Sequence, residues 1–203
     1  MAIVTLPLNL SYREFRWGVL DYELQEMSEP TGDTADRILG PSRWSAYLVS
    51  NDDMPLSEAA RWEWLVLNLR GGNVLAIYDI VRKQPSGTMR GSPVLAASAA
   101  VGDTSCQITT TGTLKLGDWF GIGTGFGTSQ LVKVAADASP VTGTLTVTFN
   151  QPLRKAYAAG TVVVWDKPVA YMKRMNKQAT LGQYGVQGTG QGGFTIDLME
   201  RFG

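Results

Sequence analysis

The sequence predicts a mainly β protein with one α-helix, in which a small all-β module interrupts a larger β domain. Three observations favour this fold class. Helical periodicity is confined to residues 58–70. Five short segments rich in Thr and Val follow one another between 106 and 166, with turn residues between them. Residues 1–91 and 169–203 each lack a complete sheet, so we expect them to share one, with 92–168 inserted as a small barrel or sandwich.

The first 50 residues predict two strands joined by a loop. Within 15–24, apolar and acidic side chains alternate from Val19 onward, which is typical of a half-buried strand. Pro, Gly and Asp are frequent in 29–36 and predict a loop. The second strand is expected at 43–50, where apolar residues return.

The predicted helix has recognisable ends and one apolar face. Ser57 is the expected N-cap, and Glu58 lies near the positive end of the helix dipole. Gly71 and Gly72 follow the helix and can adopt the left-handed conformation that ends it. The apolar face is formed by residues spaced three and four apart, Ala59, Trp62, Val66 and Leu69, and is widened by Leu65.

Two tryptophans of this helix have different expected environments. Trp62 and Trp64 are two positions apart, which separates them by roughly 200° around the helix axis. Because Trp62 belongs to the apolar face, Trp64 must point away from it. Trp64 then meets a second layer of this chain, a loop, or a partner chain, since Trp is favoured at interfaces.

The remaining strands are predicted from apolar runs and alternating patterns. The run 73–81 predicts a strand buried on both faces. The inserted module is expected to hold strands at 106–111, 118–123, 130–136, 144–150 and 161–166. Two further strands are expected at 170–175 and 194–202, with a glycine-rich loop between them.

The segment 120–130, FGIGTGFGTSQ, has glycine at every second position from 121 to 127. A dinucleotide-binding fingerprint requires G-x-G-x-x-G between a strand and a helix, but its last position here is Phe126. The loop has no lysine and is followed by a strand-like pattern, so no helix N-terminus would face a phosphate. We predict a β-hairpin instead, with its first strand ending at Ile122, a turn over 124–128, and a second strand from Gln130. Phe126 at the turn is a candidate contact residue.

The composition disfavours most enzyme chemistry. The chain has no histidine and one cysteine, Cys106, which removes His-dependent nucleophile pairs and most transition-metal sites. Carboxylates such as Asp21 and Glu23 leave glycoside hydrolysis as the one enzymatic hypothesis, although they are equally typical of a solvated strand face. We predict no catalytic residue, no cofactor and no metal. The balance of 18 basic and 18 acidic residues disfavours nucleic-acid binding, and no apolar run approaches the roughly 20 residues of a membrane helix.

Charges of opposite sign gather in different parts of the chain. Residues 1–36 hold seven acidic and two basic side chains, whereas 150–180 hold six basic and one acidic. Opposed patches suit head-to-tail contact between identical subunits, which closes into rings, but the two segments can equally be neighbours within one subunit. The candidate contact residues are Glu23, Glu26, Trp64, Phe126, Arg154, Lys155, Lys173 and Arg174.

Three groups of short motifs follow one another from about residue 55. The first is ARWEWLVLNLRGG with NVLAIYDIVRKQPSGTMRG, the second LKLGDWFGIG, LVKVAADA and QPLRKAYAAGTVV, and the third FTIDLMER. In this order they resemble distal tail proteins of long-tailed bacteriophages and related baseplate or minor tail proteins. The matching residues of the first two groups are Trp62, Leu65, Leu69, Gly71, Asp79, Pro85, Gly87, Thr88 and Gly91, then Leu116, Gly117, Asp118, Val132, Val134, Pro152, Leu153, Arg154 and Gly160.

The resemblance implies a tail-tube-type β-sandwich with a flanking helix, which forms a six-fold ring between the tail tube and the tail-tip hub. The implied partners are copies of the chain, the tail-tube protein, the hub and the tape-measure protein. The implied location is the virion tail tip, after synthesis in the host cytoplasm, and the implied role is structural. The alternative is that module 92–168 binds a host-surface carbohydrate by stacking Trp119, Phe126 or Trp165 on sugars, although the strand positions of Trp119 and Trp165 favour burial.

Overall fold

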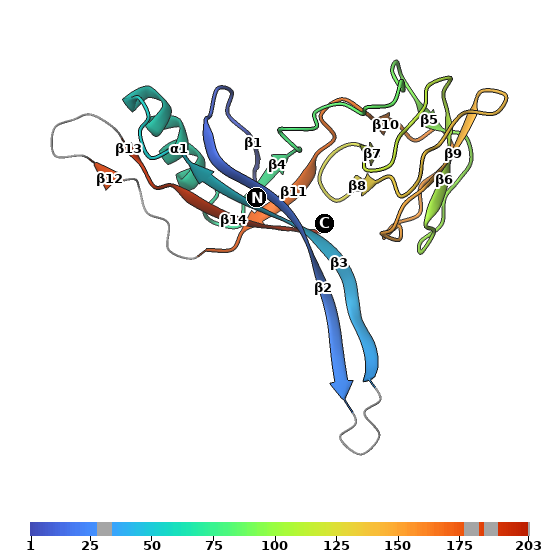
Figure 1. The fold of residues 1–203 in the computed structure, drawn as a ribbon, viewed down its shortest axis with the longest axis horizontal. Helices are drawn as coiled ribbons and strands as arrows, with labels where there is room; N and C mark the ends of the chain where they lie inside the picture. Colours follow the sequence, from blue (N-terminus) through green and yellow to red (C-terminus); the bar gives the residue numbers. More distant parts are fainter. Residues whose placement is uncertain (28–33, 177–182, 185–190, 203) are drawn as a thin grey trace. The chain divides into compact units, whose positions relative to one another are not determined.

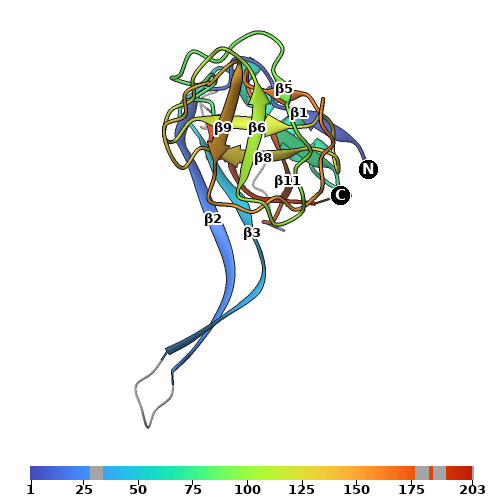
Figure 2. The ribbon, with the colours of Figure 1, turned by 90° about the vertical axis from the view of Figure 1, so that its right-hand side faces the viewer.

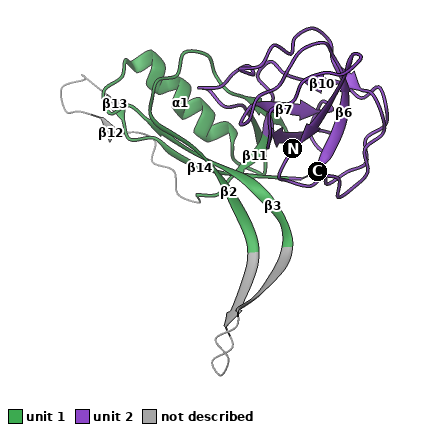
Figure 3. Cartoon of the chain, turned by 45° about the vertical axis from the view of Figure 1, so that its right-hand side comes forward, with its two compact units in different colours: residues 1–76, 171–201 green, residues 77–170, 202–203 purple. Residues whose placement is uncertain are grey.

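The computed structural model of the protein describes residues 1–27, 34–176, 183–184 and 191–202, with only the backbone described for 23–27, 34–39, 183–184 and 191 (Figure 1). The prediction of a mainly β fold with one helix is confirmed. The chain forms two compact units, Met1–Ala76 with Tyr171–Arg201, and Ile77–Ala170 with Phe202–Gly203 (Figure 3). The sequence placed the inserted module at 92–168, inside this second unit.

The first unit is built on a six-stranded sheet in the order β1–β4–β11–β14–β3–β2. β1 and β4 are parallel, whereas the pairs β11–β14, β14–β3 and β3–β2 are antiparallel. The strands are β1 (Ile3–Thr5), β2 (Tyr12–Met27), β3 (Thr34–Ser50), β4 (Val74–Ile77), β11 (Ala170–Arg174) and β14 (Thr195–Glu200). A separate pair is formed by β12 (Gln183–Tyr184) and β13 (Gln191–Gly192).

β2 and β3 form a hairpin that is longer than the sheet to which it belongs. The two strands pair from Tyr12 and Ser50 out to Met27 and Thr34. β14 pairs with β3 only along 45–49, so the outer part of the hairpin consists of two strands alone. Figures 1 and 2 show this hairpin leaving the rest of the sheet. The prediction of a loop at 29–36 is wrong for 34–36, because these residues pair with 25–27 and belong to β3. Residues 29–33 of the predicted loop lie outside the described residues.

Helix α1 (Leu56–Asn68) begins and ends two residues earlier than predicted. The N-cap is Pro55 and not Ser57, and it makes no side-chain cap hydrogen bond. Proline suits this boundary because its ring fixes φ, here at −62°, and because an N–H at this position would have no partner within the helix. The Pro55 carbonyl accepts the N–H groups of Glu58 and Ala59 in the first turn. Beyond the C-cap, Gly71 and Gly72 have φ of 67° and 85°, the left-handed conformation predicted for them.

The core of the first unit lies between α1 and the sheet. Trp62 is fully buried, stacks on Phe194 at 6.0 Å between ring centroids, and meets Tyr12 edge-on at 5.5 Å. The other predicted face residues, Ala59, Leu65, Val66 and Leu69, are buried with it. The apolar stripe of the helix therefore faces the sheet, as the spacing predicts.

The second unit is a small barrel made from two three-stranded sheets. One sheet has the order β5–β6–β9 and the other β10–β7–β8. Bridges from Val134 to Phe149 and from Val94 to Val162 join the sheets along both pairs of edges, which closes the barrel. The strands are β5 (Val94–Leu95), β6 (Ser105–Thr109), β7 (Trp119–Ile122), β8 (Gln130–Lys133), β9 (Thr144–Thr148) and β10 (Val163–Val164). All five strands predicted for the module are present, in shorter form.

The glycine-rich segment forms the predicted hairpin turn of this barrel. β7 ends at Ile122 and β8 begins at Gln130. Gly123, Gly125 and Gly127 have φ of 77°, 88° and 78°, so backbone conformation accounts for three of the four alternate glycines without any phosphate.

Candidate contact surface

The residues that the composition singled out have different surroundings. Cys106 is buried in the barrel core, and this burial raises the pKa of its thiol to about 12. Asp21 is exposed on the outer hairpin, and the side chain of Glu23 lies outside the described residues. Among the residues that the structure describes, no three Cys, Asp or Glu side chains gather as a metal ion needs, and no helix there is long and apolar enough to cross a membrane.

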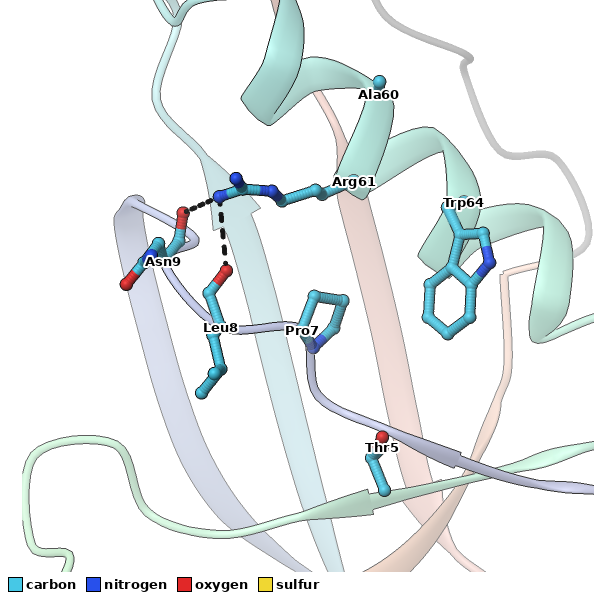
Figure 4. Close-up of a pocket in the computed structure, with 7 residues that line it drawn as sticks. All are labelled: Thr5, Pro7, Leu8, Asn9, Ala60, Arg61 and Trp64. Atoms are coloured by element: carbon cyan, nitrogen blue, oxygen red, sulfur yellow. Dashed lines mark hydrogen bonds between the residues drawn. The ribbon is translucent and has the colours of Figure 1, made fainter.

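One concave surface of the first unit is an open groove of about 600 Å³ beside α1. One wall is α1 and the other is the segment that connects β1 to β2 (Figure 4). The lining residues, which we call the α1 groove, are Thr5, Pro7, Leu8, Asn9, Ala60, Arg61 and Trp64.

Two polar contacts fix the walls of the α1 groove. The Arg61 guanidinium donates from Nη1 to the carbonyl oxygens of Leu8 and Asn9, at 3.4 and 3.3 Å. Asn9 presents its carbonyl from a left-handed conformation, with φ of 59°. Closer to the start of the helix, the Glu58 carboxylate accepts the backbone N–H and the hydroxyl of Ser11. These contacts tie the first turns of α1 to the segment between β1 and β2.

Trp64 supplies the one aromatic ring among the described residues that line the groove. Its side chain is 48% exposed while Trp62 is fully buried, so the predicted difference between the two tryptophans is confirmed. In Figure 4 the Trp64 ring faces the side of the groove formed by Pro7 and Thr5. Leu8 is 79% exposed at the other end. Apolar surface of this kind, with a single cation fixed at one side, suits an apolar segment of a partner.

The six-stranded sheet presents a second kind of contact surface at its edges. Among the described strands, β2 pairs with β3 alone and β1 pairs with β4 alone. Val19 and Leu20 on β2 are 47% and 42% exposed. A long edge strand without a covering element offers its backbone N–H and C=O groups to another chain.

The predicted contact residues fall into separate places. In the first unit, Trp64 lines the groove, Lys173 is exposed on β11, and Arg174 is half-buried with Nη1 donating to the carbonyl of Val66. Burial, and the nearby charge of Arg70, lower the pKa of Arg174. Glu23 and Glu26 lie on the outer part of β2, and their side chains lie outside the described residues.

In the second unit the structure brings three predicted residues to one end of the barrel. Phe126 is half-buried in the β7–β8 turn, and the Lys155 ammonium donates to the neighbouring carbonyl of Gly127. The guanidinium of Arg154 lies 3.7 Å from the ring centroid of Phe202. These side chains already have contacts within the unit.

Two of the aromatic side chains considered for sugar stacking, Trp119 and Trp165, are buried or already in contact with other groups of the chain. Trp119 is 3% exposed, too little for a sugar ring to stack on it. The ring of Trp165 is half-buried, its Nε1 donates to the carbonyl of Gly91, and the Arg90 guanidinium lies 5.0 Å from its centroid.

The sequence did not predict that the segment between β1 and β2 forms the side of the α1 groove opposite Trp64. Pro7, Leu8 and Asn9 precede α1 by about fifty positions, and no local pattern indicates that they face it. The one available signal was the exposed position of Arg61, three residues before Trp64 on the same helix.

Comparison with known proteins adds no relative: no family model matches the chain, and no curated protein matches it.

Proposed function

We propose that the chain is a structural subunit that assembles with copies of itself into a ring, and that this ring belongs to the tail tip of a long-tailed bacteriophage. The ring joins the tail tube to the baseplate hub. The role is one of assembly, with no reaction at any site.

The observation that carries this proposal is the β2–β3 hairpin at the edge of an open sheet. β2 has 16 residues and its outer side pairs with no described strand. An edge of this length exposes a row of unpaired backbone groups, which a partner chain can satisfy. Part of the hairpin also extends past the sheet, so it has length available to lie against a neighbouring subunit.

A ring follows from the difference between the two ends of the sheet. The β2 edge and the β1 edge are different surfaces, so contact between them is head-to-tail. Repeated head-to-tail contacts form a ring where the rotation from one subunit to the next closes. Separately from the sheet edges, the acidic residues 1–36 and the basic residues 150–180 give the chain segments of opposite charge, which also suit head-to-tail contact between copies.

The α1 groove supports contact with further partners. Its exposed Trp64 lies on α1 and its exposed Leu8 on the segment between β1 and β2, so both lie on the helix side of the sheet and outside its strands. A ring built through sheet edges leaves this side available to the proteins stacked above or below. By the resemblance described above, these are the tail-tube protein, the hub and the tape-measure protein.

A cryo-electron microscopy map of purified virions that encode the chain tests the placement. We expect density that fits the six-stranded sheet, α1 and the hairpin, repeated around the tail axis at the tip. Detection of the chain in infected cells together with its absence from purified particles would contradict the proposal.

A further inference from the structure

A cluster of charged side chains surrounds the indole of Trp119 in the second unit, apart from the surfaces described above. Trp119 is the first residue of β7, and Lys133, the last residue of β8, is its direct cross-strand partner. Asp79 and Arg82 come from the segment that follows β4. The cluster therefore combines a rigid barrel hairpin with a short loop.

Asp79 organises the cluster and has no acceptor capacity left. Its carboxylate is buried, and Oδ1 accepts the backbone N–H groups of Val81 and Arg82 at 2.9 and 3.0 Å. Oδ2 accepts Arg82 Nε and Trp119 Nε1, both at 3.1 Å. Four hydrogen bonds use the lone pairs of a carboxylate. Asp79 therefore fixes the guanidinium and the indole but cannot also bind the Lys133 ammonium.

Arg82 and Lys133 both lie near the ring of Trp119, and both have N–H groups that donate no hydrogen bond to any described residue. Lys133 Nζ lies 5.0 Å and Arg82 Cζ 5.9 Å from the centroid of Trp119. Arg82 Nη1 donates to the carbonyl of Gly117 at 3.3 Å. In the described part of the chain, neither Arg82 Nη2 nor Lys133 Nζ donates a hydrogen bond. The cluster thus carries one negative and two positive charges, with unused N–H groups on both cations.

The two cations converge on a glycine. A Cβ added at Gly117 would lie 3.6 Å from Arg82 Nη1 and 4.0 Å from Lys133 Cε. Gly117 has φ of 85°, so the position disfavours any side chain. Burial, and then the charge of Arg82, lower the pKa of Lys133, against the opposing effect of Asp79. Two cations held together without a second counter-ion are stabilised by an anion that contacts both.

We propose that Arg82 and Lys133 form a binding site for an oxyanion, the carboxylate or phosphate group of a ligand, above Gly117. The guanidinium offers planar N–H donors that match the oxygens of such a group, and the ammonium adds a compact charge. The ring of Trp119 packs against both cations and orients them, and it does not itself contact the ligand. All residues of the site belong to the second unit, whereas the strand edges proposed for ring contact belong to the first.

The test is a titration of the ¹⁵N-labelled full chain with sodium phosphate and with sodium acetate, each at constant ionic strength against sodium chloride. We expect a saturable shift of the Trp119 indole N–H and the Gly117 amide signals with at least one of the two oxyanions. Lys133→Gln is expected to weaken binding roughly tenfold, because one charge-assisted hydrogen-bond partner is lost. Lys133→Arg is expected to retain it. Lys167→Gln, which removes an exposed lysine of the same unit, is the matched control and leaves binding unchanged.

Phosphate binding without acetate binding would assign a tetrahedral group, and the reverse a planar one. Shifts that grow linearly with concentration for both oxyanions, or that match those in chloride, would overturn the proposal. So would saturable binding that Lys133→Gln leaves unaltered in a variant with the wild-type unfolding temperature.

Discussion

The ring of Trp62 on α1 lies nearly parallel to the ring of Phe194 just before β14, with 13° between their planes and 6.0 Å between their centroids. Both side chains are fully buried. This contact fastens the only helix of the described chain to the sheet, and it sets the outward direction of Trp64.

Replacing Trp62 is expected to destabilise the first unit strongly. Trp62→Ala leaves a cavity between α1 and the sheet, and a buried tryptophan truncated to alanine costs about 3–5 kcal/mol. Urea unfolding followed by circular dichroism measures the difference. A change in the free energy of unfolding below about 1 kcal/mol would show that the helix does not depend on this contact.

Replacing Trp64 is expected to affect association and not folding. Trp64→Ala removes an exposed side chain, so the free energy of unfolding should change by less than about 0.5 kcal/mol. Binding of the proposed tail partners should weaken, which co-sedimentation with purified tail tubes or hub protein can measure. Leu67→Ala, an exposed position of α1 outside the groove, is the matched control and should bind normally. Equal binding by all three proteins would remove the groove from the account.

A charge on the edge strand is expected to block assembly. Val19→Lys places an ammonium at the exposed edge of β2, which disfavours pairing with another chain. Sedimentation velocity should show smaller species at an unchanged unfolding temperature. Val101→Lys, at an exposed apolar position of the second unit, provides the comparison. Assembly by the Val19 variant to the wild-type extent would argue against the β2 edge as the interface.

Asp118 is expected to make the second unit sensitive to acid. Burial raises the pKa of this carboxyl, but hydrogen bonds from the Ser86 side chain and the backbone N–H groups of Lys115, Ser86 and Gly87 together lower it below the ordinary 3.8. A lowered folded-state pKa stabilises the fold at neutral pH, and this contribution is lost as pH falls through the ordinary value to the folded-state pKa.

Asp118→Asn should therefore destabilise the protein at pH 7 by about 1–3 kcal/mol, with the difference from wild type shrinking below about pH 4. Unfolding free energies measured from pH 7 to pH 3 test this. Asp53→Asn, at an exposed position, should follow the wild-type curve. A constant difference between Asp118→Asn and wild type at every pH would contradict the role assigned to the carboxylate.

The glycine-rich turn gives a prediction that separates backbone conformation from steric space. Gly123 and Gly125 both have positive φ, so alanine at either position costs about 1–2 kcal/mol. A Cβ at Gly123 would also lie 2.5 Å from the Thr128 carbonyl oxygen, whereas at Gly125 the nearest atom is the Thr128 hydroxyl at 3.4 Å. Gly123→Ala should thus be the more destabilising in thermal unfolding. The opposite order would mean that the turn relaxes around Gly123.

Local patterns predicted those parts of the fold that depend on local rules. The β7–β8 hairpin was predicted from alternation and turn residues, and its limits at Ile122 and Gln130 are confirmed. The outward position of Trp64 followed from helix geometry alone. Ser57 is not the N-cap because the helix already begins at Leu56, directly after Pro55.

Features made by distant segments escaped prediction. The length of β3 depends on pairing with β2, which overrides the turn-forming residues at 34–36. The groove requires residues 5–9 to cross beside α1, and the Arg82–Lys133 pair requires a loop after β4 to meet the end of β8. In each case the contact is set by tertiary packing, which carries no short-range periodicity.

Ring formation by the purified full chain is the most direct test of the proposed function. Sedimentation velocity combined with negative-stain electron microscopy should reveal closed rings of identical subunits, several times the 22.0 kDa mass of one chain. Rings that disappear in Val19→Lys and persist in Val101→Lys are the predicted result. The proposed function would be contradicted if the protein stays a 22.0 kDa monomer up to high protein concentration and also fails to form rings when tail partners are added.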